Sequence, residues 1–570
     1  MNPRIRRIML QPDTTVSEAM EAMTASVRQT PAGPSGIALI VDGSNTLLGI
    51  LTDGDVRRFL LRGGDIAAMA QDAMNTHPFT LASTLTPAEM LDQVLGETKR
   101  RGLRPTAIEK IVIVSSDGKP WDVLSFFELW RQTDVATRTV AIIGLGYVGL
   151  TFALTLADFG LSVVGTDIDQ SVLSKLRAGD IPFYERGLRE LLRLQLQKGF
   201  RLTDAFHEHP SDVYVVCVGT PVDALRRPDL AALLSSVESV ARVLKPYDLV
   251  ILRSTVPVGT CRETVIPLIE KVSGLAAGKT FFFAFAPERT AEGRALTELR
   301  TLPQVIGGFD PTSAALAGKL FRLITPAIVP VGSLEEAELV KLLNNSYRDL
   351  IFSFANETSR FCHALGVNAH DVISAANQGY IRDRIPLPSP GVGGACLTKD
   401  PYLLAASAAA HGVTLELPIA SRRINEDMIG HIHNRVMRFL DERRAGGGGP
   451  QKIFAMGMAF KGDPETSDVR YSTTVMIARA LQKEGPDVFV HDAVASVDDP
   501  ETKDLRFVSV DEGMADASAV LILNNHPAYH SERLLPLLDR TASPALLFDA
   551  WNMFKDVRDL IPGHIRYQSL

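Results

Sequence analysis

At 570 residues the chain is too long for one hydrophobic core, so we expect three or four domains. Hydrophobic residues at 46% and charged residues at 22% are typical of a globular protein, and the formal charge of −7 gives no reason to expect nucleic acid or an anionic membrane as a partner. Four cysteines without a CxxC pair do not make a disulfide framework. The sequence has no signal peptide and no apolar run of membrane-spanning length, so we expect a cytoplasmic protein.

Residues 1–136 are predicted to form a module of their own, because two stretches within them resemble each other. Each stretch runs from an apolar strand through a turn into a second short strand, at 38–60 and at 111–130. A helix-like stretch precedes each one, at 16–23 and at 86–97. The pattern indicates a duplicated unit of two strands and a helix.

In each repeat a hydroxyl residue stands three positions before an acid: Thr52 before Asp55, and Ser125 before Glu128. The duplicated unit resembles a CBS-domain pair. That resemblance implies an adenine nucleotide in the cleft between the two halves, with these four side chains at its ribose. The alternative is a pair that packs against the rest of the protein and binds nothing.

A different pattern begins after this module. The run at 139–150 is a buried strand that leads into a glycine-rich turn, and a helix-like stretch and a second strand follow it. Further strand-like runs come at 213–221, 248–257 and 279–288. Regular alternation of strands and helices predicts an α/β domain over 137–331, with a parallel sheet covered on both faces.

The turn after the first of these strands carries Gly144, Gly146 and Gly149 in a G-x-G-x-x-G spacing. The first glycine permits a tight turn, the second lets the backbone approach a pyrophosphate, and the third lets helix and strand pack closely. The helix that starts there offers free N–H groups to the phosphates. Asp167, at the end of the next strand, is expected to bind the ribose hydroxyls and to favour NAD over NADP. Two further residues of the turn complete this set: Tyr147 and Val148.

Residues 333–365 contain no Gly or Pro and repeat apolar residues every three or four positions, which predicts one long helix. We expect this helix to join two α/β domains within a central region over 332–445. Four glycines at 446–449 mark a linker, and a second α/β domain follows over 450–570. The predicted fold class is therefore α/β, with two Rossmann-like domains joined by a long helix and preceded by an α+β module.

The segment 388–400, PSPGVGGACLTKD, is the richest in chemistry. Its glycines let the backbone fold tightly around a ligand. Cys396 follows them directly and lies near Lys399. Because a nearby cation lowers the pKa of a thiol, Cys396 is a candidate nucleophile. Cys217, which lies in a predicted strand, is expected to be buried and inert.

Lys341 and Asn345 are four residues apart on the long helix and therefore share one face. The residues around Lys341 are apolar and predict that this part of the helix is enclosed: Leu339, Val340, Leu342 and Leu343. An enclosed ammonium needs a partner, and a developing alkoxide or oxyanion would serve.

Seven motifs follow one another through the rest of the chain: GLGYVGL, VGTP, STVPVGT, APERTAEG, ELVKLLNN, GVGGACLTKD and GMAFKGDPETSDVR. Together they resemble the UDP-glucose/GDP-mannose dehydrogenase family over about 137–560. The resemblance implies an enzyme that oxidises the primary alcohol of a nucleotide sugar to a carboxylate and uses two NAD for each sugar. Two alternatives are another Rossmann dehydrogenase that transfers a single hydride, and a catalytically idle nucleotide sensor built on the CBS-like module.

The resemblance also implies roles for single residues. Cys396 attacks the intermediate aldehyde, and a second oxidation converts the thiohemiacetal into a thioester. Lys341 and Asn345 stabilise the negative oxygen. For the hydrolysis of the thioester, Glu288 is the base and Thr255 positions it. Asp400 holds a water or transfers a proton; all six of these residues are present in this sequence.

Two sets of binding residues are implied as well. The set for NAD adds Thr220, Thr255, Lys399 and Arg470. The set for the nucleotide sugar consists of Glu288, Glu292, Lys341, Asn345, Arg384, Gly393 and Lys461. The family implies a homodimer, or a larger homo-oligomer, that forms through the long helix, and no metal site is expected. A UDP-sugar is favoured over GDP-mannose, while glucose, N-acetylglucosamine and N-acetylmannosamine stay open.

Overall fold

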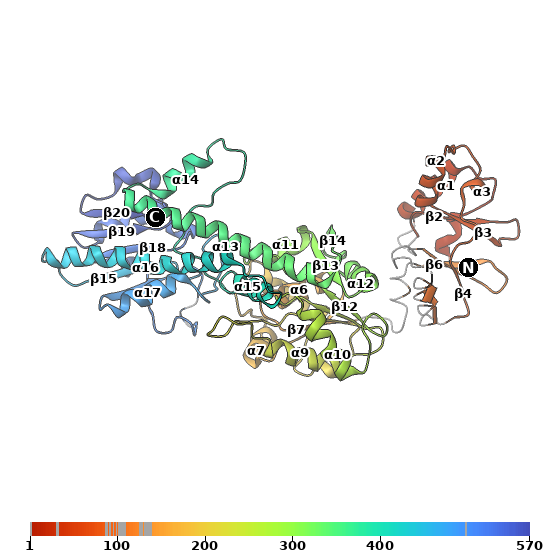
Figure 1. Cartoon of the computed structure of the whole chain (residues 1–570), viewed down its shortest axis with the longest axis horizontal. Helices are drawn as coiled ribbons and strands as arrows, with labels where there is room; N and C mark the ends of the chain where they lie inside the picture. Colours follow the sequence, from red (N-terminus) through yellow and green to blue (C-terminus); the bar gives the residue numbers. More distant parts are fainter. Residues whose placement is uncertain are drawn as a thin grey trace. The chain divides into compact units, whose positions relative to one another are not determined.

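The computed structural model describes residues 3–29, 34–85, 110–124, 139–495 and 499–570, with a few single residues between these ranges. The chain divides into two compact units, one of Met1–Arg138 with Asp310–Lys319 and one of Thr139–Phe309 with Leu320–Leu570. Figure 1 labels many of the helices and strands of both units. No helix among the described residues is both long enough and apolar enough to cross a membrane.

The N-terminal module consists of two three-stranded sheets with the same connectivity. They contain β1 (Met9–Leu10), β2 (Ile37–Val41) and β3 (Leu47–Thr52), and β4 (Thr80–Ala82), β5 (Ile111–Val114) and β6 (Pro120–Leu124). In each sheet the first pair of strands is parallel and the second pair antiparallel, and the register shifts within the antiparallel pair. One hydrophobic core contains buried residues of both sheets, such as Leu39 and Val112. The duplication that the sequence indicates is therefore visible in the backbone.

Three helices accompany the first sheet: α1 (Val16–Gln29), α2 (Asp53–Leu61) and α3 (Ala70–Ala73). Helix α1 confirms the helix predicted at 16–23 and continues beyond it. Of the second predicted helix, at 86–97, those residues that the structure describes are helical. Ser125 and Glu128 lie outside the described residues.

The second unit begins with an eight-stranded sheet of order β14-β13-β12-β11-β10-β7-β8-β9. Its strands are β7 (Thr139–Ile143), β8 (Ser162–Thr166), β9 (Phe200–Leu202), β10 (Val213–Val216), β11 (Leu249–Leu252), β12 (Phe282–Phe285), β13 (Gln304–Gly308) and β14 (Ile328–Pro330). Its helices are α6 (Tyr147–Asp158), α7 (Gln170–Arg177), α8 (Leu188–Gln195), α9 (Ala231–Ala241), α10 (Ile266–Ser273) and α11 (Ala295–Thr301). Helix α12 (Pro311–Phe321) follows β13 in the chain, and its residues up to Lys319 belong to the first unit. Successive residues of the central strands, such as Val215 and Val216, are both fully buried, so both faces of the sheet are covered as predicted.

The sheet is not purely parallel, which corrects the prediction. Strand β13 pairs with β12 in the antiparallel sense, from Ala284 opposite Gly308 to Phe285 opposite Gly307. An antiparallel neighbour needs no crossover, so segment 286–303 leaves and re-enters the sheet at the carboxyl end of β12. This segment carries Glu288 and Glu292, and the reversal keeps both at the edge where the parallel strands β7 to β12 end.

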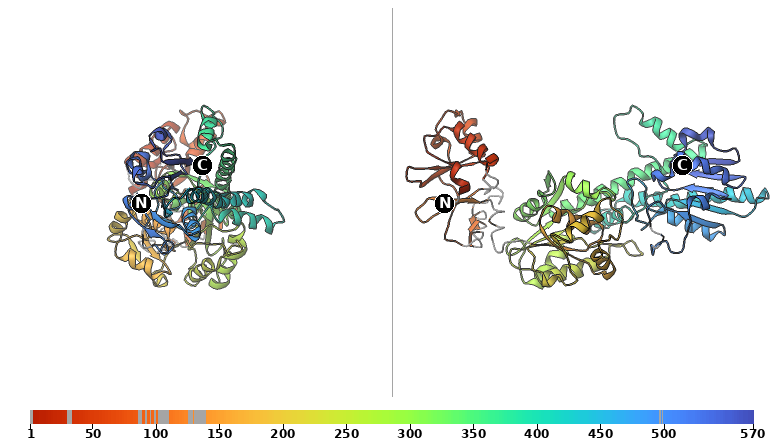
Figure 2. Two further views of the ribbon diagram at one scale, coloured as in Figure 1. Left: turned by 90° about the vertical axis from the view of Figure 1, so that its left-hand side faces the viewer. Right: turned by 180° about the vertical axis from the view of Figure 1, so that it is seen from behind.

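Long helices connect this sheet to the C-terminal domain. They are α13 (Leu334–Leu365), α14 (Ala369–Asn377), α15 (Asp400–Ala410) and α16 (Glu416–Ala445). Helix α13 begins after Ser333, whose side chain accepts the N–H of Glu336, and ends at Gly366 in the left-handed conformation with φ of 73°. It confirms the long helix predicted from the sequence. Figures 1 and 2 show α13 alongside α16, against which it packs.

The C-terminal domain is a six-stranded, all-parallel sheet of order β17-β16-β15-β18-β19-β20. Its strands are β15 (Lys452–Met456), β16 (Asp487–His491), β17 (Arg506–Phe507), β18 (Ala519–Ile522), β19 (Ala545–Asp549) and β20 (Ile565–Ser569). Its helices are α17 (Thr473–Lys483), α18 (Val510–Met514) and α19 (Ser531–Leu534). The strand order reverses between β15 and β18, and in such sheets ligands bind in the crevice at the carboxyl ends of the strands next to that point. The segment after β15 holds Lys461 and Arg470.

Candidate active site

The glycine-rich turn between β7 and α6 has the geometry of a phosphate-binding loop. Gly144 has φ of +91°, and a Cβ on Gly149 would lie 1.8 Å from the Gly144 carbonyl oxygen, so neither position accepts a side chain. The capping position of α6, Gly146, offers no side chain to the first N–H groups, and the first turn contains no acid. These free N–H groups and the positive end of the helix dipole fit the pyrophosphate of a dinucleotide.

Asp167 directly follows β8 and is tied to the same turn. Its Oδ2 accepts the N–H of Leu145 at 2.7 Å, and its Oδ1 accepts the N–H of Asp169 at 2.9 Å. The carboxylate is half-buried and therefore open on one side to a ribose. On the neighbouring strands, the buried Thr220 hydroxyl donates to the Thr255 carbonyl, so the ends of β10 and β11 are joined next to this turn.

The cysteine loop lies between the C-terminal domain and the central helices. A Cβ on Gly393 would stand 2.7 Å from the Tyr471 carbonyl oxygen, so this glycine permits close contact with the segment after β15. Gly391 has φ of +101° and would meet the Asn425 carbonyl of α16 at 2.6 Å. The loop ends in a turn in which the N–H of Asp400 donates to the Cys396 carbonyl at 3.0 Å. The segment in front of α15 is thus held from both sides.

Cys396 is an exposed residue, yet the surrounding protein desolvates the thiol. Desolvation raises the pKa of Cys396, and the Lys341 charge only partly opposes it. The prediction that nearby cations leave this thiol with a lowered pKa is therefore wrong in sign. Burial likewise raises the pKa of Cys217 to about 12, which agrees with an inert thiol, although Cys217 is half-buried and lies one residue beyond β10.

Lys341 is buried, with 8% of its surface exposed, and its ammonium makes no hydrogen bond or ion pair with any described residue. Its charge acts on both Glu288 and Cys396 and lowers the pKa of each. The predicted enclosure of the helix holds on one side only, because Leu342 is fully buried while Leu343 is 49% exposed. An unpaired ammonium at this depth is available to a negative oxygen of a ligand.

Asn345 and Asp400, both predicted to be catalytic, are in contact. Asn345 Nδ2 donates to Asp400 Oδ2 at 2.5 Å, and Lys399 Nζ donates to Asp400 Oδ1 at 2.6 Å. Asp400 has no exposed surface. The Lys399 ammonium is therefore paired with this carboxylate, which leaves Lys341 as the main cation acting on the Cys396 thiol.

Glu288 is 7% exposed and is held from two directions. Its Oε1 accepts the N–H groups of Arg289 and Thr290, each at 2.7 Å, and its Oε2 accepts a hydrogen bond from Arg253. Desolvation acts to raise the pKa of Glu288, but Arg253, Thr290 and Lys341 together outweigh it and leave that pKa below its usual value.

Arg253 was not predicted from the sequence. The signal was available, because it is a charged residue that directly follows the four buried apolar residues of β11. A second group outside the prediction is Glu185, which accepts the hydroxyl of Tyr147. Tyr147 is thus anchored by its hydroxyl, and the N–H of Gly293 donates to Glu185 at 2.7 Å.

Glu292 lies where the two α/β domains meet. The Lys461 ammonium donates to the Glu292 carbonyl oxygen at 2.7 Å, and the Thr466 hydroxyl donates to Oε2 at 3.1 Å. Burial raises the pKa of Glu292 to about 7; Asp468 adds to this, while Lys461 and Arg470 oppose it. Glu292 also raises the pKa of Cys396, so this carboxyl belongs to the same cleft.

Arg470 and Arg384 differ in their placement. Arg470 forms a two-pronged pair with Asp468, with distances of 2.6 and 2.9 Å, and its charge interacts with Cys396. Arg384 is exposed and lines a pocket of about 860 Å³ with residues of α14 and with Asn552 and Lys555. None of the other predicted site residues lines that pocket.

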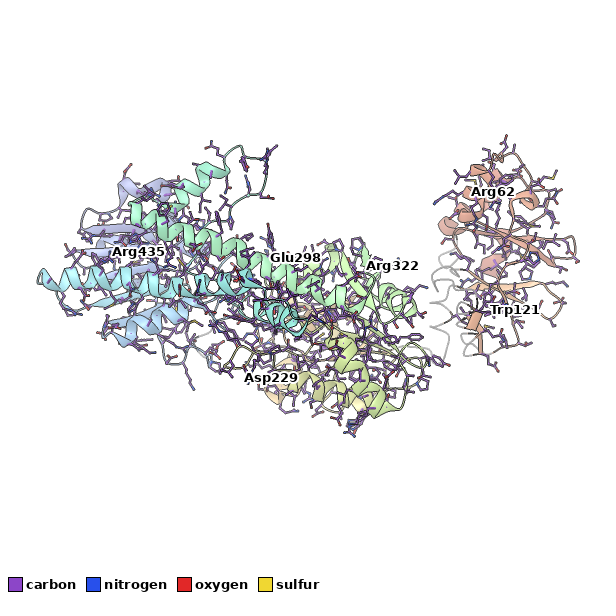
Figure 3. All side chains as sticks on the ribbon, in the orientation of Figure 1. Arg62, Trp121, Asp229, Glu298, Arg322 and Arg435 are labelled. Atoms are coloured by element: carbon purple, nitrogen blue, oxygen red, sulfur yellow. The ribbon has the colours of Figure 1, made fainter. Side chains whose placement is uncertain are left out.

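The segment after Glu288 is anchored to α11. Glu298, labelled in Figure 3, accepts the N–H of Ala291 at 2.7 Å.

In the N-terminal module, Thr52 and Asp55 bind each other: the Asp55 N–H donates to the Thr52 hydroxyl at 3.2 Å, and Asp55 Oδ2 accepts the Thr52 N–H at 2.9 Å. Among the described residues, no three His, Cys, Asp or Glu side chains are arranged as a metal site.

These features define a class of protein: a Rossmann-fold oxidoreductase with an NAD-binding turn and a cleft that combines a thiol, an unpaired ammonium and buried carboxylates. The models of one family match the second unit in order. They are the UDP-glucose/GDP-mannose dehydrogenase family NAD binding domain over 138–325, central domain over 335–427 and UDP binding domain over 454–556. A CBS domain matches residues 1–62. The second sheet of the module has the same strand order, and its identity as another CBS domain stays a prediction.

Proteins with similar sequences are nucleotide-sugar dehydrogenases by name. A UDP-N-acetyl-D-mannosamine dehydrogenase from Pyrococcus horikoshii is 33% identical over 424 residues, which cover 73% of this chain and 96% of the relative. A UDP-N-acetyl-D-glucosamine 6-dehydrogenase from Pseudomonas aeruginosa is 33% identical over 364 residues, which cover 63% and 84%. The chain belongs to the UDP-glucose/GDP-mannose dehydrogenase family and is an NAD-dependent nucleotide-sugar dehydrogenase with an N-terminal CBS domain.

Solved structures have the same fold. The UDP-D-ManNAc dehydrogenase of Pyrococcus horikoshii matches with a TM-score of 0.67 and 30% identity, over 76% of this chain and 98% of that one. A UDP-glucose dehydrogenase from Pyrobaculum islandicum matches with a TM-score of 0.63 and 28% identity, over 73% and 95%.

Proposed function

We propose that this enzyme oxidises the primary alcohol of a UDP-N-acetylhexosamine to the carboxylate through a thioester on Cys396, with UDP-glucose as the second candidate substrate. The observation that carries the proposal is Lys341, a buried residue whose ammonium is unpaired among the described residues and whose charge acts on both Cys396 and Glu288. A positive group in this position serves an oxygen that becomes negative during the reaction.

The first oxidation requires that the alcohol lose a proton as its carbon loses a hydride. When bound, NAD accepts one hydride in each of the two oxidations, so one sugar consumes two NAD. Lys341 stabilises the alkoxide as it develops, and the Asn345 amide supports the same oxygen. Asp400, which holds both Asn345 and Lys399, fixes this face of the cleft.

The second oxidation runs through the thiol. The Cys396 sulfur adds to the aldehyde carbon, its proton leaves, and the resulting thiohemiacetal loses a hydride to become a thioester. The raised pKa of Cys396 means that the thiol must lose its proton during the attack, and Lys341 favours that loss. The bond between carbon and sulfur keeps the reactive aldehyde from leaving between the two steps.

Hydrolysis completes the reaction. Glu288 takes a proton from the attacking water, and Thr255, whose carbonyl oxygen accepts the Thr220 hydroxyl, is proposed to position that base. The carbon–sulfur bond breaks and the thiol is restored. In total, one alcohol, two NAD⁺ and one water give one carboxylate, two NADH and three protons.

The binding residues follow from the placement of the two domains. We propose that the turn at Gly144, Gly146 and Gly149 binds the pyrophosphate of NAD and that Asp167 binds its ribose. Lys461 and Glu292, joined across the two domains, border the nucleotide sugar. Arg384 stands apart from them in the described chain, and a contact with the sugar nucleotide would have to come from another copy of the chain or from a movement of its loop.

The sugar is proposed from the relatives. The two relatives at 33% identity act on UDP-N-acetyl-D-mannosamine and UDP-N-acetyl-D-glucosamine by name, while the matching UDP-glucose dehydrogenase structure is 28% identical. The decisive measurement is the NADH formed per sugar from UDP-N-acetylmannosamine, UDP-N-acetylglucosamine, UDP-glucose and GDP-mannose. Two NADH from one UDP-sugar support the proposal, and one NADH per sugar would contradict the thioester route.

We also propose that the chain forms a homodimer through α13. Five apolar side chains lie on the face of this helix that other elements leave uncovered, and each is 49–64% exposed: Leu343, Tyr347, Phe354, Phe361 and Leu365. Their spacing of four and seven residues forms a single stripe. Light scattering on wild type and on Phe354→Glu tests this, and a monomeric wild type would contradict it.

The CBS domain suggests regulation by an adenine nucleotide. The motif residues Thr52 and Asp55 stand at the start of α2, and their hydroxyl and carboxylate are the groups that a ribose would contact. We expect AMP or ATP to change the rate of NADH formation. Identical kinetics with and without saturating nucleotide would contradict this part of the proposal.

A further inference from the structure

A fully buried arginine lies behind the cleft. Arg253 directly follows β11, and its side chain has no exposed surface. The guanidinium carbon is 4.5 Å from the centre of the Phe152 ring and 5.1 Å from that of Phe321. A guanidinium enclosed in this way needs an anionic partner, because an unpaired buried charge is strongly destabilising.

Arg253 fixes the chain in front of Glu288 as well as its carboxylate. Nη2 donates to Glu288 Oε2, and Nη1 donates to the Ala286 carbonyl at 3.2 Å and to Gln304 Oε1 at 3.1 Å. The Gln304 amide in turn donates to the Pro287 carbonyl at 2.9 Å. Both carbonyls that precede Glu288 are thereby held, directly or through one side chain, by the same guanidinium.

The second carboxylate oxygen of Glu288 has different partners from the first. Its remaining oxygen accepts two backbone N–H groups, and the Lys341 ammonium is close enough to lower its pKa. We propose that Arg253 is a positioning residue for hydrolysis of the Cys396 thioester, because it fixes the Glu288 carboxylate on the Lys341 side of the cleft. This inference rests on the proposed function. Arg253 itself, with no exposed surface, touches neither substrate nor cofactor.

The position of Arg253 makes its effect specific to one step. The two oxidations use Cys396 and Lys341, whereas the base that Arg253 holds acts only after the thioester has formed. Without the arginine, the Glu288 carboxylate loses the partner that fixes its Oε2 and is free to turn away from the thioester. The thioester is then expected to form at a nearly normal rate and to persist.

The test compares Arg253→Met with wild type in rapid-mixing kinetics, using the UDP-sugar that gives two NADH. We expect a fast phase of two NADH per active site, followed by turnover that is slower on the order of 100-fold. Intact-mass spectrometry should find the acyl adduct on Cys396 during the slow phase. Arg253→Lys should shorten the lifetime of the adduct again, because an ammonium still pairs with Glu288. Arg300→Met is the matched control, since Arg300 forms a surface pair with Asp158, and it should show no adduct.

Two results would overturn the inference: full-rate turnover by Arg253→Met, or loss of the fast phase without an adduct in protein that melts like wild type. If Arg253→Met does not fold, the double variant Arg253→Met/Glu288→Gln is used in its place, because it removes both charges of the pair. That double variant should hydrolyse the adduct as slowly as Glu288→Gln alone, and an additional slowing would also overturn the inference. A wild type that yields one NADH per sugar would instead reject the thioester route itself, before any variant is compared.

Discussion

The sequence predicts two clusters of polar functional residues, and in the structure the two differ in how far their polar groups are paired. In the catalytic cleft, Lys341 is buried without a partner among the described residues, next to a desolvated thiol. In the N-terminal module, Thr52 and Asp55 form a reciprocal capping box at the start of α2, and Arg58 pairs with Asp55 at 2.5 Å. Every polar group of the second cluster already serves local structure.

A cluster with an unpaired charged group can bind or react, whereas a cluster whose polar groups all have partners supports local structure. An ammonium without a protein partner on a largely buried side chain is available to a ligand, provided that other contacts fix the fold around it. Here those contacts are the Asn345–Asp400–Lys399 chain and the Arg253–Glu288 pair. In the capping box, by contrast, every polar group already has a partner, and a ribose that binds there must replace hydrogen bonds that already exist.

The largest effect is expected from Cys396→Ser. Loss of the thiol should lower the rate of uronate formation on the order of 10⁴-fold or more, because a serine hydroxyl is a much weaker nucleophile than a thiol. Quantifying uronate by mass spectrometry checks this. Cys362→Ala, which changes a buried thiol of α13, is the control and should stay near the wild-type rate. Normal uronate formation by Cys396→Ser would remove the thioester from the mechanism.

A smaller loss is expected from Lys341→Met. The methionine fills the same space without the charge, so kcat should fall on the order of 10²–10³-fold, while the protein should remain folded. The exposed Lys271 on α10 provides the control, and Lys271→Met should leave kcat unchanged. A Lys341 variant with wild-type kcat would show that the unpaired ammonium has only a structural function.

Glu288→Gln is expected to destabilise the fold as well as slow the reaction. It leaves the Arg253 guanidinium buried without its anionic partner, which should cost about 3–5 kcal/mol of unfolding free energy. The surface pair Glu335–Arg262 provides the comparison, and Glu335→Gln should cost no more than about 1 kcal/mol. Denaturant unfolding of both variants measures the difference. Equal losses would mean that burial adds nothing to the Arg253 pair.

Glu292 should make stability depend on pH. Its pKa is raised from 4.5 to about 7, so the protonated form is favoured in the folded state. The stabilisation is fully present below about pH 4.5 and is lost as the pH rises through about 7. From pH 5 to 8 we expect wild type to lose roughly 1–3 kcal/mol relative to Glu292→Gln. The exposed Glu190→Gln, measured in parallel, controls for the removal of one surface charge. A pH-independent gap for Glu292→Gln would contradict the raised pKa of Glu292.

The smallest effect is expected in the module. Thr52→Ala removes the capping hydroxyl of α2 and should cost about 1 kcal/mol, with no change in the rate of sugar oxidation in the absence of nucleotide. Thr24→Ala, on the exposed side of α1, is the control and should be neutral. Thermal melting followed by kinetics separates the two effects. A large loss of basal activity in Thr52→Ala would show that this cap, too, has a part in catalysis.

Features that depend on neighbours along the chain could be predicted from the sequence alone. The glycine spacing placed the phosphate-binding turn, the absence of Gly and Pro predicted α13 to within one residue, and the glycines before Cys396 indicated its loop. Hydrogen bonds within a turn or helix and the periodicity of apolar residues act over a few positions, so these features could be read directly from the order of the residues.

Which charged groups form pairs depends on the tertiary structure and could not be predicted from the sequence. Arg253 and Glu288 are 35 positions apart, and Asn345 and Asp400 are 55 apart, so their pairing follows from how strands and helices are placed and not from local pattern. The same holds for the antiparallel β13, for the raised pKa of Cys396 and for the separate pocket at Arg384. Desolvation and charge depend on the three-dimensional surroundings of a group, and folding alone sets those surroundings.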